Sequence, residues 1–199
     1  MRIHSVWLNS LLLLAALTIL CGGLYPILVT FVAQGFFRDR ADGSLLRMHG
    51  RVIGSSLLAQ SFDAPGYFHA RPSACGYSTL PSGASNWAPT SASLKDSVNQ
   101  RRIRFLKENG LGEGTSVPVE MLCASGSGLD PHISPEAARL QVGRVASQRH
   151  FNEVQKQKLT ESIARMTESR QLGVLGEPRI NVLRLNFILD NAPEFRMLE

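Results

Sequence analysis

One feature near the N-terminus restricts the fold more than any other: a long apolar run that carries almost no charge. No Asp, Glu, Lys or Arg occurs between Ile3 and Phe37. Within this stretch, Val6 to Val32 is close to continuously apolar. A helix needs about 20 apolar residues to cross the hydrocarbon core of a bilayer, so the run is long enough to span one. We therefore expect a membrane-spanning helix, kinked where Pro26 interrupts its backbone hydrogen bonds.

A cleaved signal peptide is the alternative interpretation of this run. Signal peptides have an apolar core of about 7–15 residues, which is shorter than the one here, and the difference favours an uncleaved anchor. The flanking charges leave the orientation open, because Arg2 lies on one side and both Arg38 and Arg40 lie on the other. The very short N-terminal tail is compatible with an N-terminus in the cytoplasm and an exported domain.

Length and charge limit what the rest of the chain can be. The 199 residues leave room for about one domain beyond the anchor. The net charge of +5 is small and spread out, and no aromatic-basic motif accompanies it, so we expect no nucleic-acid partner. Cys21 lies in the apolar run. Cys75 and Cys123 are expected to be two separate buried thiols, with a disulfide as the alternative if the domain is extracytoplasmic.

The pattern beyond the anchor predicts an α+β fold. It consists of one N-terminal transmembrane helix followed by a single mixed α/β globular domain with a small sheet and three or four helices. The predicted divisions are a tail and anchor helix at 1–37, a connector at 38–49, the globular domain at 50–190 and a C-terminal tail at 191–199. No internal repeat is evident, which agrees with a single domain.

Start and stop signals mark three helices of this domain. The first is expected over Ser93–Asn109, with Gly110 as its terminator. The second begins at Ser134, an N-cap serine that is followed by Pro135 at the first helical position. The third begins at Asn152, which has a glutamine three residues further on, as in a capping box.

Three other segments are expected to form strands. The first begins at Gly50 and is rich in β-branched residues. The second is Val117–Cys123, with a proline near its start. The third is Ile180–Leu189, in which apolar residues alternate and would share one face. Tyr67–Pro72 is expected to be an extended segment that ends at the proline.

Two loops rich in Gly and Ser are the first places to look for function. One runs from Ser73 to Ser93 and the other from Ala124 to Ile133. Long loops inside a compact domain are often functional, although turn chemistry that only fixes the fold is the alternative. Backbone N–H groups in such a loop can also bind an anion such as phosphate. The candidate partner- or ligand-contact residues are Ser82, Gly83, Ser85, Asn86, Ser125, Gly126, Ser127, Gly128, Asp130 and His132.

The sequence gives little sign of catalysis. The phosphate-binding loop, the nucleophile elbow, the zinc-protease helix and the Cys-x-x-Cys motif are all absent. Ser125, Asp130 and His132 are the residue types of a hydrolytic triad, but on one short loop they would struggle to reach triad geometry. We therefore expect no catalytic residue and no metal site. A membrane-anchored extracytoplasmic hydrolase that uses Ser125 and His132 is kept as the alternative.

The second of these loops carries a specific resemblance. The twelve residues from Ala124 to Pro135 resemble the signature of the KdpC family, which is the C subunit of the bacterial Kdp high-affinity potassium-transporting P-type ATPase. The resemblance continues from the anchor to about Asp190. Further matches include Tyr67-Phe68, Arg71-Pro72-Ser73-Ala74, Gln141-Val142, Arg144-Val145-Ala146, Arg149 and Gly176-Glu177-Pro178. The chain departs from the family pattern at Gly83-Ala84, which weakens any likeness of this loop to a nucleotide-binding signature.

The resemblance implies a non-catalytic accessory subunit of an ATP-driven potassium uptake complex. Its partners would be the potassium-channel-like subunit, the ATPase subunit that is phosphorylated, a small membrane subunit and the lipid bilayer. It would lie in the bacterial cytoplasmic (inner) membrane with its N-terminus inside and its globular domain outside. The resemblance also implies a role in assembly and a chaperone-like increase in the ATP affinity of the catalytic subunit. No cofactor would be bound covalently, and ATP would be reached through the complex.

Overall fold

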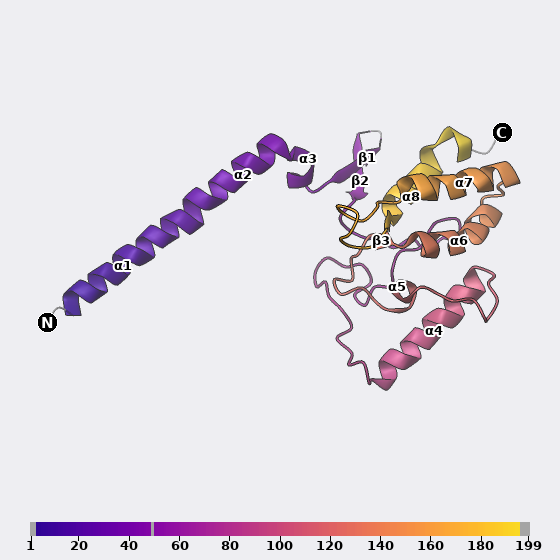
Figure 1. Ribbon diagram of the computed structural model, residues 1–199, viewed down its shortest axis with the longest axis horizontal. Helices are drawn as coiled ribbons and strands as arrows, with labels where there is room; N and C mark the ends of the chain where they lie inside the picture. Colours follow the sequence, from indigo (N-terminus) through magenta and orange to yellow (C-terminus); the bar gives the residue numbers. More distant parts are fainter. Residues whose placement is uncertain (1–2, 49, 196–199) are drawn as a thin grey trace. The chain divides into compact units, whose positions relative to one another are not determined.

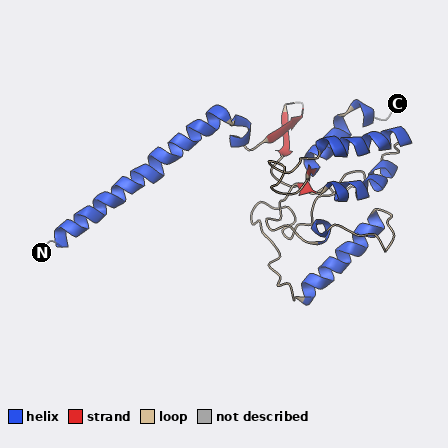
Figure 2. Cartoon of the chain, in the orientation of Figure 1, coloured by secondary structure: helices blue, strands red, loops and turns tan. Residues whose placement is uncertain are grey.

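The computed structural model describes residues 3–48 and 50–195 (Figure 1). The chain divides into two compact units, Met1–Leu45 and Leu46–Glu199. The first unit is helical, and the second combines helices with short strands and long irregular segments (Figure 2). The α+β fold predicted from the sequence is therefore confirmed.

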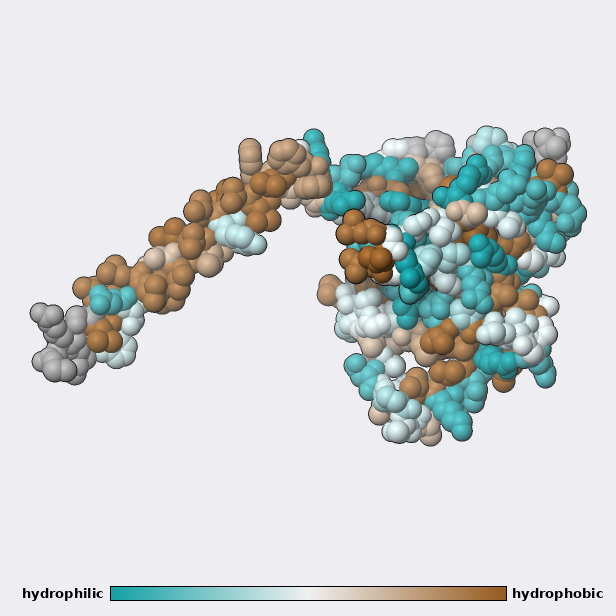
Figure 3. All heavy atoms as spheres, in the orientation of Figure 1, coloured by the Kyte–Doolittle hydropathy of each residue, from teal (hydrophilic) through white to brown (hydrophobic). Residues whose placement is uncertain are grey.

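The first unit contains the apolar helix. It is built from α1 (Ile3–Ile19), the π-helical turn η1 (Leu20–Leu24) and α2 (Tyr25–Phe36). From Val6 to Phe36 this helix is long and apolar enough to cross a membrane, and none of its most apolar stretch is buried inside the protein. The face of this helix that Figure 3 shows is mostly apolar. An exposed surface of this kind is stable only in an apolar solvent, so the helix indicates a single-pass membrane protein.

A widened turn accommodates the proline in this helix. The backbone N–H of Tyr25 donates to the carbonyl of Leu20, five residues back. In a regular α-helix the ring of Pro26 would collide with the carbonyl of Gly22, and a π-helical turn shifts that carbonyl. The sequence predicts a kink at Pro26, and the adjustment that the structure contains is this π-turn. The short helix α3 (Arg38–Ala41) follows within the predicted connector.

Two small pairs of strands follow, and all of their residues except Leu45 belong to the second unit. The first pair is β1 (Leu45–Met48) with β2 (Arg51–Ser55). The second is β3 (His132–Ile133) with β4 (Ile180–Asn181), which pair antiparallel with His132 opposite Asn181. Although each is short, the second pair joins two segments that are far apart in the sequence.

Helices make up most of the remaining regular structure. They are α4 (Ala92–Glu108), α5 (Val119–Leu122), α6 (Pro135–Gln148), α7 (Glu153–Met166), α8 (Val182–Asn191) and the 3₁₀ turn η2 (Pro193–Phe195). The predicted start signals of α6 and α7 are confirmed. The Ser134 hydroxyl accepts from the N–H of Ala137 at 3.0 Å, and Asn152 and Gln155 make both bonds of a capping box. Gly110, with φ of +63°, follows the end of α4.

Two of the predicted strands are wrong. Val117–Cys123 contains the single helical turn α5, because Pro118 suits the start of a helix as well as the edge of a strand. Only the first two residues of Ile180–Leu189 form a strand, and the rest is α8. The side chain of Asn181 caps α8 by accepting from the N–H of Arg184 at 3.0 Å.

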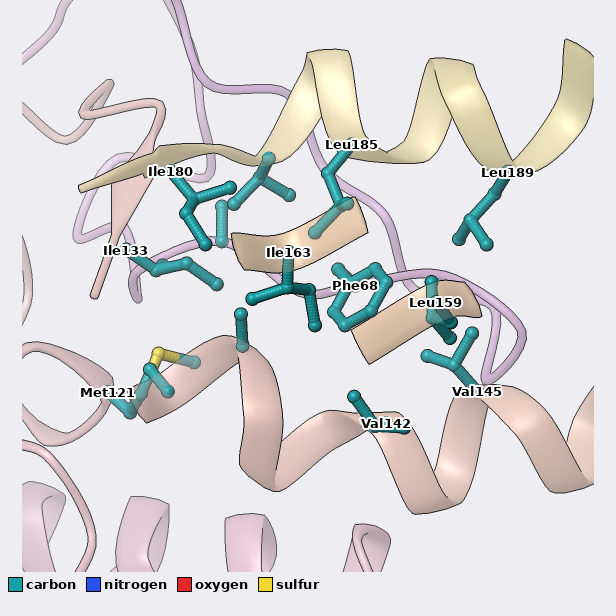
Figure 4. Close-up of a cluster of buried hydrophobic side chains, with 14 of the residues drawn as sticks. Phe68, Met121, Ile133, Val142, Val145, Leu159, Ile163, Ile180, Leu185 and Leu189 are labelled. Carbon is teal, nitrogen blue, oxygen red and sulfur yellow. The ribbon is translucent and has the colours of Figure 1, made fainter. Parts of the chain in front are cut away.

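The core of the second unit lies between α6, α7 and α8 (Figure 4). Val145 of α6, Leu159 of α7 and Leu185 of α8 are 1% exposed or less. Phe68 comes from an irregular segment and lies among them, with no exposed surface. A side chain from outside the helices therefore fills the centre of the core.

Two buried amide side chains hold the backbone that carries Phe68. The Asn186 side chain accepts from the N–H of Phe68 at 2.8 Å and donates to its carbonyl at 2.9 Å. Gln141 does the same for His69, at 2.8 and 3.2 Å. We call this arrangement the amide clamp. It satisfies backbone groups that would otherwise be unpaired in an apolar core, where each would be costly.

The amide clamp should carry a large part of the stability of the second unit. Asn186→Ala would leave the N–H and carbonyl of Phe68 unpaired, and we expect it to lower the free energy of unfolding by roughly 2–4 kcal/mol. Asn191→Ala, on the same helix, removes one half-buried bond to the Phe187 carbonyl and should cost less than about 1 kcal/mol. Urea unfolding of the full chain in detergent, followed by circular dichroism, compares the two. Equal losses would contradict the role assigned to the clamp.

Candidate functional site

The structure brings the two Gly/Ser loops together. The N–H of Ser125 donates to the carbonyl of Pro72 at 3.0 Å, just before the first loop begins. Further along, the Cys75 thiol lies 3.9 Å from the carbonyl of Gly128. The N–H of Ala59 binds the carbonyl of Leu129 at 2.9 Å. The loops therefore form one surface, although contacting residues such as Cys75 and Gly128 are 53 positions apart in the sequence.

Gly128 is the point of closest approach between the loops. Its backbone has φ of +72°, which side chains rarely adopt. A Cβ atom placed there would overlap the Cys75 thiol and would lie 2.8 Å from the carbonyl oxygen of Gly83. Gly128 thus has two separate reasons to be glycine: its conformation and the lack of space. Gly126, two residues earlier, has open space around it.

Asp130 anchors the second loop through a network of charged and polar contacts. One carboxylate oxygen accepts from the guanidinium of Arg71 at 2.8 Å. The other accepts from the backbone N–H of His132 at 3.0 Å and lies 3.6 Å from Nδ1 of its imidazole. Burial alone would raise the pKa of Asp130, but the contacts with His132 and Arg71 lower it to about 2. The carboxylate is therefore ionised at neutral pH and fixes the loop.

The hydrolase alternative is not favoured by this geometry. Ser125 is only 2% exposed, and its carbonyl accepts from the N–H of Gly128 in a tight turn. The imidazole of His132 faces Asp130, as described above. A nucleophilic serine needs an accessible hydroxyl in contact with a base, and the buried position of Ser125 suits a structural role better.

The remaining candidate residues fall into buried and exposed groups. In the second loop, Gly126 and Ser127 are exposed, and the Ser127 hydroxyl accepts from the N–H of Leu129 at 3.1 Å. In the first loop, Ser82 and Asn86 are exposed, while Gly83 and Ser85 are half-buried. Of these four residues, Gly83 is the one whose carbonyl oxygen lies beside Gly128 of the second loop. No group of three or more His, Cys, Asp or Glu suited to a metal ion occurs among residues 3–48 and 50–195.

Two open hollows flank Asp130 and His132. One, of about 730 Å³, is lined by charged residues of both signs, among them Arg71, Glu120 and Arg139, and by the start of α6. The other, of about 530 Å³, is lined by Leu57, Leu58 and the second loop. The loop therefore presents a polar side and a more apolar side, which is a surface suited to contact rather than an enclosed reaction chamber.

The cysteines are free thiols in this structure. Cys75 and Cys123 are half-buried and are not joined. The hydroxyl of Ser73 lies 3.4 Å from the Cys75 sulfur and lowers the pKa of that thiol. The two thiols are separate, as expected, but each is half-buried rather than buried, and Cys75 has a packing role that the sequence did not reveal.

Sequence reasoning missed three residues that build the site. Arg71 and Gln141 occur in motifs that match the family, but the sequence assigns neither a role, and Arg71 holds Asp130. Gln141 and Asn186 form the amide clamp that fixes the backbone leading to Arg71. The signal was present in part, because Gln141 lies on the same helical face as the apolar residues of α6, and a buried amide there needs a partner.

Substitution of Gly128 should show whether this position needs glycine because the two loops approach closely or only because the loop is flexible. We expect Gly128→Ala to lower the free energy of unfolding by roughly 2–4 kcal/mol, because the new Cβ meets the Gly83 carbonyl and the backbone is left-handed. Gly126→Ala should change it by less than about 0.5 kcal/mol. Urea unfolding of the full chain measures both. Adding Cys75→Ala to Gly128→Ala should restore only part of the loss, since the carbonyl contact remains. Full restoration would contradict the geometry.

Comparisons with known proteins agree with the resemblance seen in the sequence. The family described as K+-transporting ATPase, c chain (KdpC) matches residues 7–191. A protein of Koribacter versatilis is 45% identical over 93% of this chain and 94% of its own length. One of Rhodospirillum rubrum is 49% identical over 91% and 93%, and one of Geobacter sulfurreducens is 48% identical over 91% and 95%. All three are named potassium-transporting ATPase KdpC subunit. The chain therefore belongs to the KdpC family.

Proposed function

We propose that the chain is a non-catalytic accessory subunit of a potassium-transporting ATPase complex and that its two joined loops dock onto other subunits. The observation that carries this proposal is the contrast within the second loop. Gly126 and Ser127 are exposed, while Ser125 and Asp130 beneath them are fixed by hydrogen bonds and charge. A surface that is rigid before it binds loses little conformational entropy on binding. This arrangement favours docking over chemistry on the loop.

The proposed partners are the potassium-channel-like subunit, the phosphorylated ATPase subunit and the small membrane subunit. Family membership supports a place in the complex, and the family resemblance supports these three partners. A role in assembly follows directly, because a docked subunit stabilises the assembled state by mass action.

We further propose that the chain raises the ATP affinity of the catalytic subunit indirectly. ATP is cytoplasmic, whereas the proposed location of the globular domain is outside the inner membrane, with the N-terminus inside. The effect would then pass through the anchor helix and the subunits that it touches. Such coupling is reciprocal, so ATP would tighten the binding of this chain to the complex by the same factor.

The docking role can be tested with a bulky side chain at an open glycine. Gly126→Trp adds a large side chain at an exposed point with no neighbour within 4 Å, so the fold should be retained. We expect co-purification with the other ATPase subunits, and potassium-stimulated ATP hydrolysis, to fall about ten-fold or more, as for a central interface position. Gly112→Trp, which is equally open but lies in another loop, is the matched control. A Gly126→Trp protein that still assembles normally would rule out this docking surface.

The proposed sidedness has its own measurement. A single cysteine in place of the exposed Glu113, in a chain without Cys21, Cys75 and Cys123, should react in intact cells with a reagent that does not cross the inner membrane. A cytoplasmic control protein should remain unlabelled until the membrane is broken. If Glu113→Cys is also protected until then, the domain is cytoplasmic and a direct contact with ATP becomes the simpler mechanism.

A further inference from the structure

A short arm in the second unit, held by two isolated β-bridges, carries a cluster of exposed apolar side chains. Its base is the bridge between Glu168 and Arg179, and a second bridge joins Gln171 to Leu175. Between them the chain turns through Leu172, Gly173 and Val174. The exposed fractions are 91% for Leu172, 73% for Val174 and 57% for Leu175. We call these three side chains the apolar tip.

The fold itself does not account for the apolar tip. Leu172 has φ of +53°, a left-handed conformation that costs a leucine more than it costs glycine or asparagine. Either of those residues would make the turn more easily and would expose no apolar side chain to water. Figure 3 shows an apolar patch at the edge of the second unit, where this arm lies in Figure 1. Exposed apolar clusters of this kind mark places that bind another apolar surface.

The size of the tip argues for a lipid surface rather than a stable protein interface. Three side chains on one turn present a small surface area. They can bury only a fraction of the roughly 1,600 Å² that a standard protein interface buries. A bilayer, in contrast, can take up a few apolar side chains at the boundary between its headgroups and acyl chains.

The anchor also keeps a bilayer within reach of the second unit. The spanning helix ends at Phe36, and the second unit begins at Leu46. Even if fully extended, the chain between them covers no more than about 35 Å. Leu46 therefore stays within about 35 Å of the end of the spanning helix, which raises the effective concentration of lipid around the second unit.

The charges beside the tip are suited to such a contact. Arg170 pairs with Glu177 at 2.7 Å, and Arg179 pairs with Glu168 at 3.0 Å. Each flanking cation is therefore neutralised within the arm. No unpaired charge of these four has to approach the lipid, and no attraction to anionic headgroups is needed.

We propose that the apolar tip inserts into the bilayer on the side where the second unit lies, as a second point of membrane attachment. The tip enters the region between headgroups and acyl chains, while the two ion pairs remain at the level of the headgroups. This contact depends on apolar area and is independent of lipid charge. It goes beyond the docking role proposed above and does not depend on it.

The experiment uses the full chain reconstituted alone into phosphatidylcholine vesicles. A fluorophore sensitive to polarity is attached to a single cysteine at Val174, in a chain without the native cysteines. Val154, on α7, is 63% exposed and has the same side chain, so a probe at Val154 is the matched control. Lipids brominated near the headgroup should quench the Val174 probe roughly three-fold or more above the Val154 probe, as shallow insertion requires.

A second variant tests the tip itself while keeping the turn. Asparagine adopts left-handed backbone readily, so Leu172→Asn with Leu175→Ser should fold normally and lose most of the excess quenching at position 174. Quenching should be equal in neutral vesicles and in vesicles that contain phosphatidylglycerol. Equal quenching at positions 174 and 154 would overturn the proposal, as would quenching that requires anionic lipid. A response that appears only after the other ATPase subunits are added would also overturn it and assign the tip to a protein partner.

Discussion

The amide clamp is the interaction on which the rest of the second unit depends. Phe68 occupies the centre of the core, yet it comes from a segment without a strand partner among the described residues. A segment can enter an apolar core only if its N–H and carbonyl groups are bonded. Asn186 and Gln141 each provide one donor and one acceptor, so together they replace the edge of a β-sheet. A core of three helices can thereby hold an irregular chain.

The clamp also determines where the candidate site forms. Arg71 and Pro72 follow the clamped residues after only one intervening residue, so the clamp restricts their positions. Arg71 then binds Asp130, and the carbonyl of Pro72 receives the N–H of Ser125. The second loop is therefore placed by contacts that begin in the core. This explains how a loop rich in glycine and serine can be rigid, since its stability comes from its partners rather than from its own composition.

Sequence reasoning predicted those elements whose signals are local. The anchor helix, the capped starts of α6 and α7 and the glycine after α4 each depend on a few adjacent residues, and all are present. The sequence predicts a strand where α8 lies, because apolar residues alternate along Ile180–Leu189 and would share one face, whereas the buried positions of α8 include the polar Asn186. Once Asn186 is counted as buried, the pattern becomes helical, with Val182, Leu185 and Leu189 on the same face. A buried polar residue therefore makes a helical pattern of buried positions hard to recognise from the apolar residues alone.

The contacts that build the candidate site could not be predicted from local signals, for a different reason. The contacts of Arg71 with Asp130, and of Cys75 with Gly128, join residues that are distant in sequence, and no local pattern encodes them. Composition and the family resemblance both indicate that this loop matters, but neither predicts these contacts. The proposed contacts also complete one another mechanically, since a domain on a single helical tether can still rotate. The anchor, the docking loop and the apolar tip would give three points of attachment, which would limit this rotation. A subunit held in this way can influence its partners without any chemistry of its own.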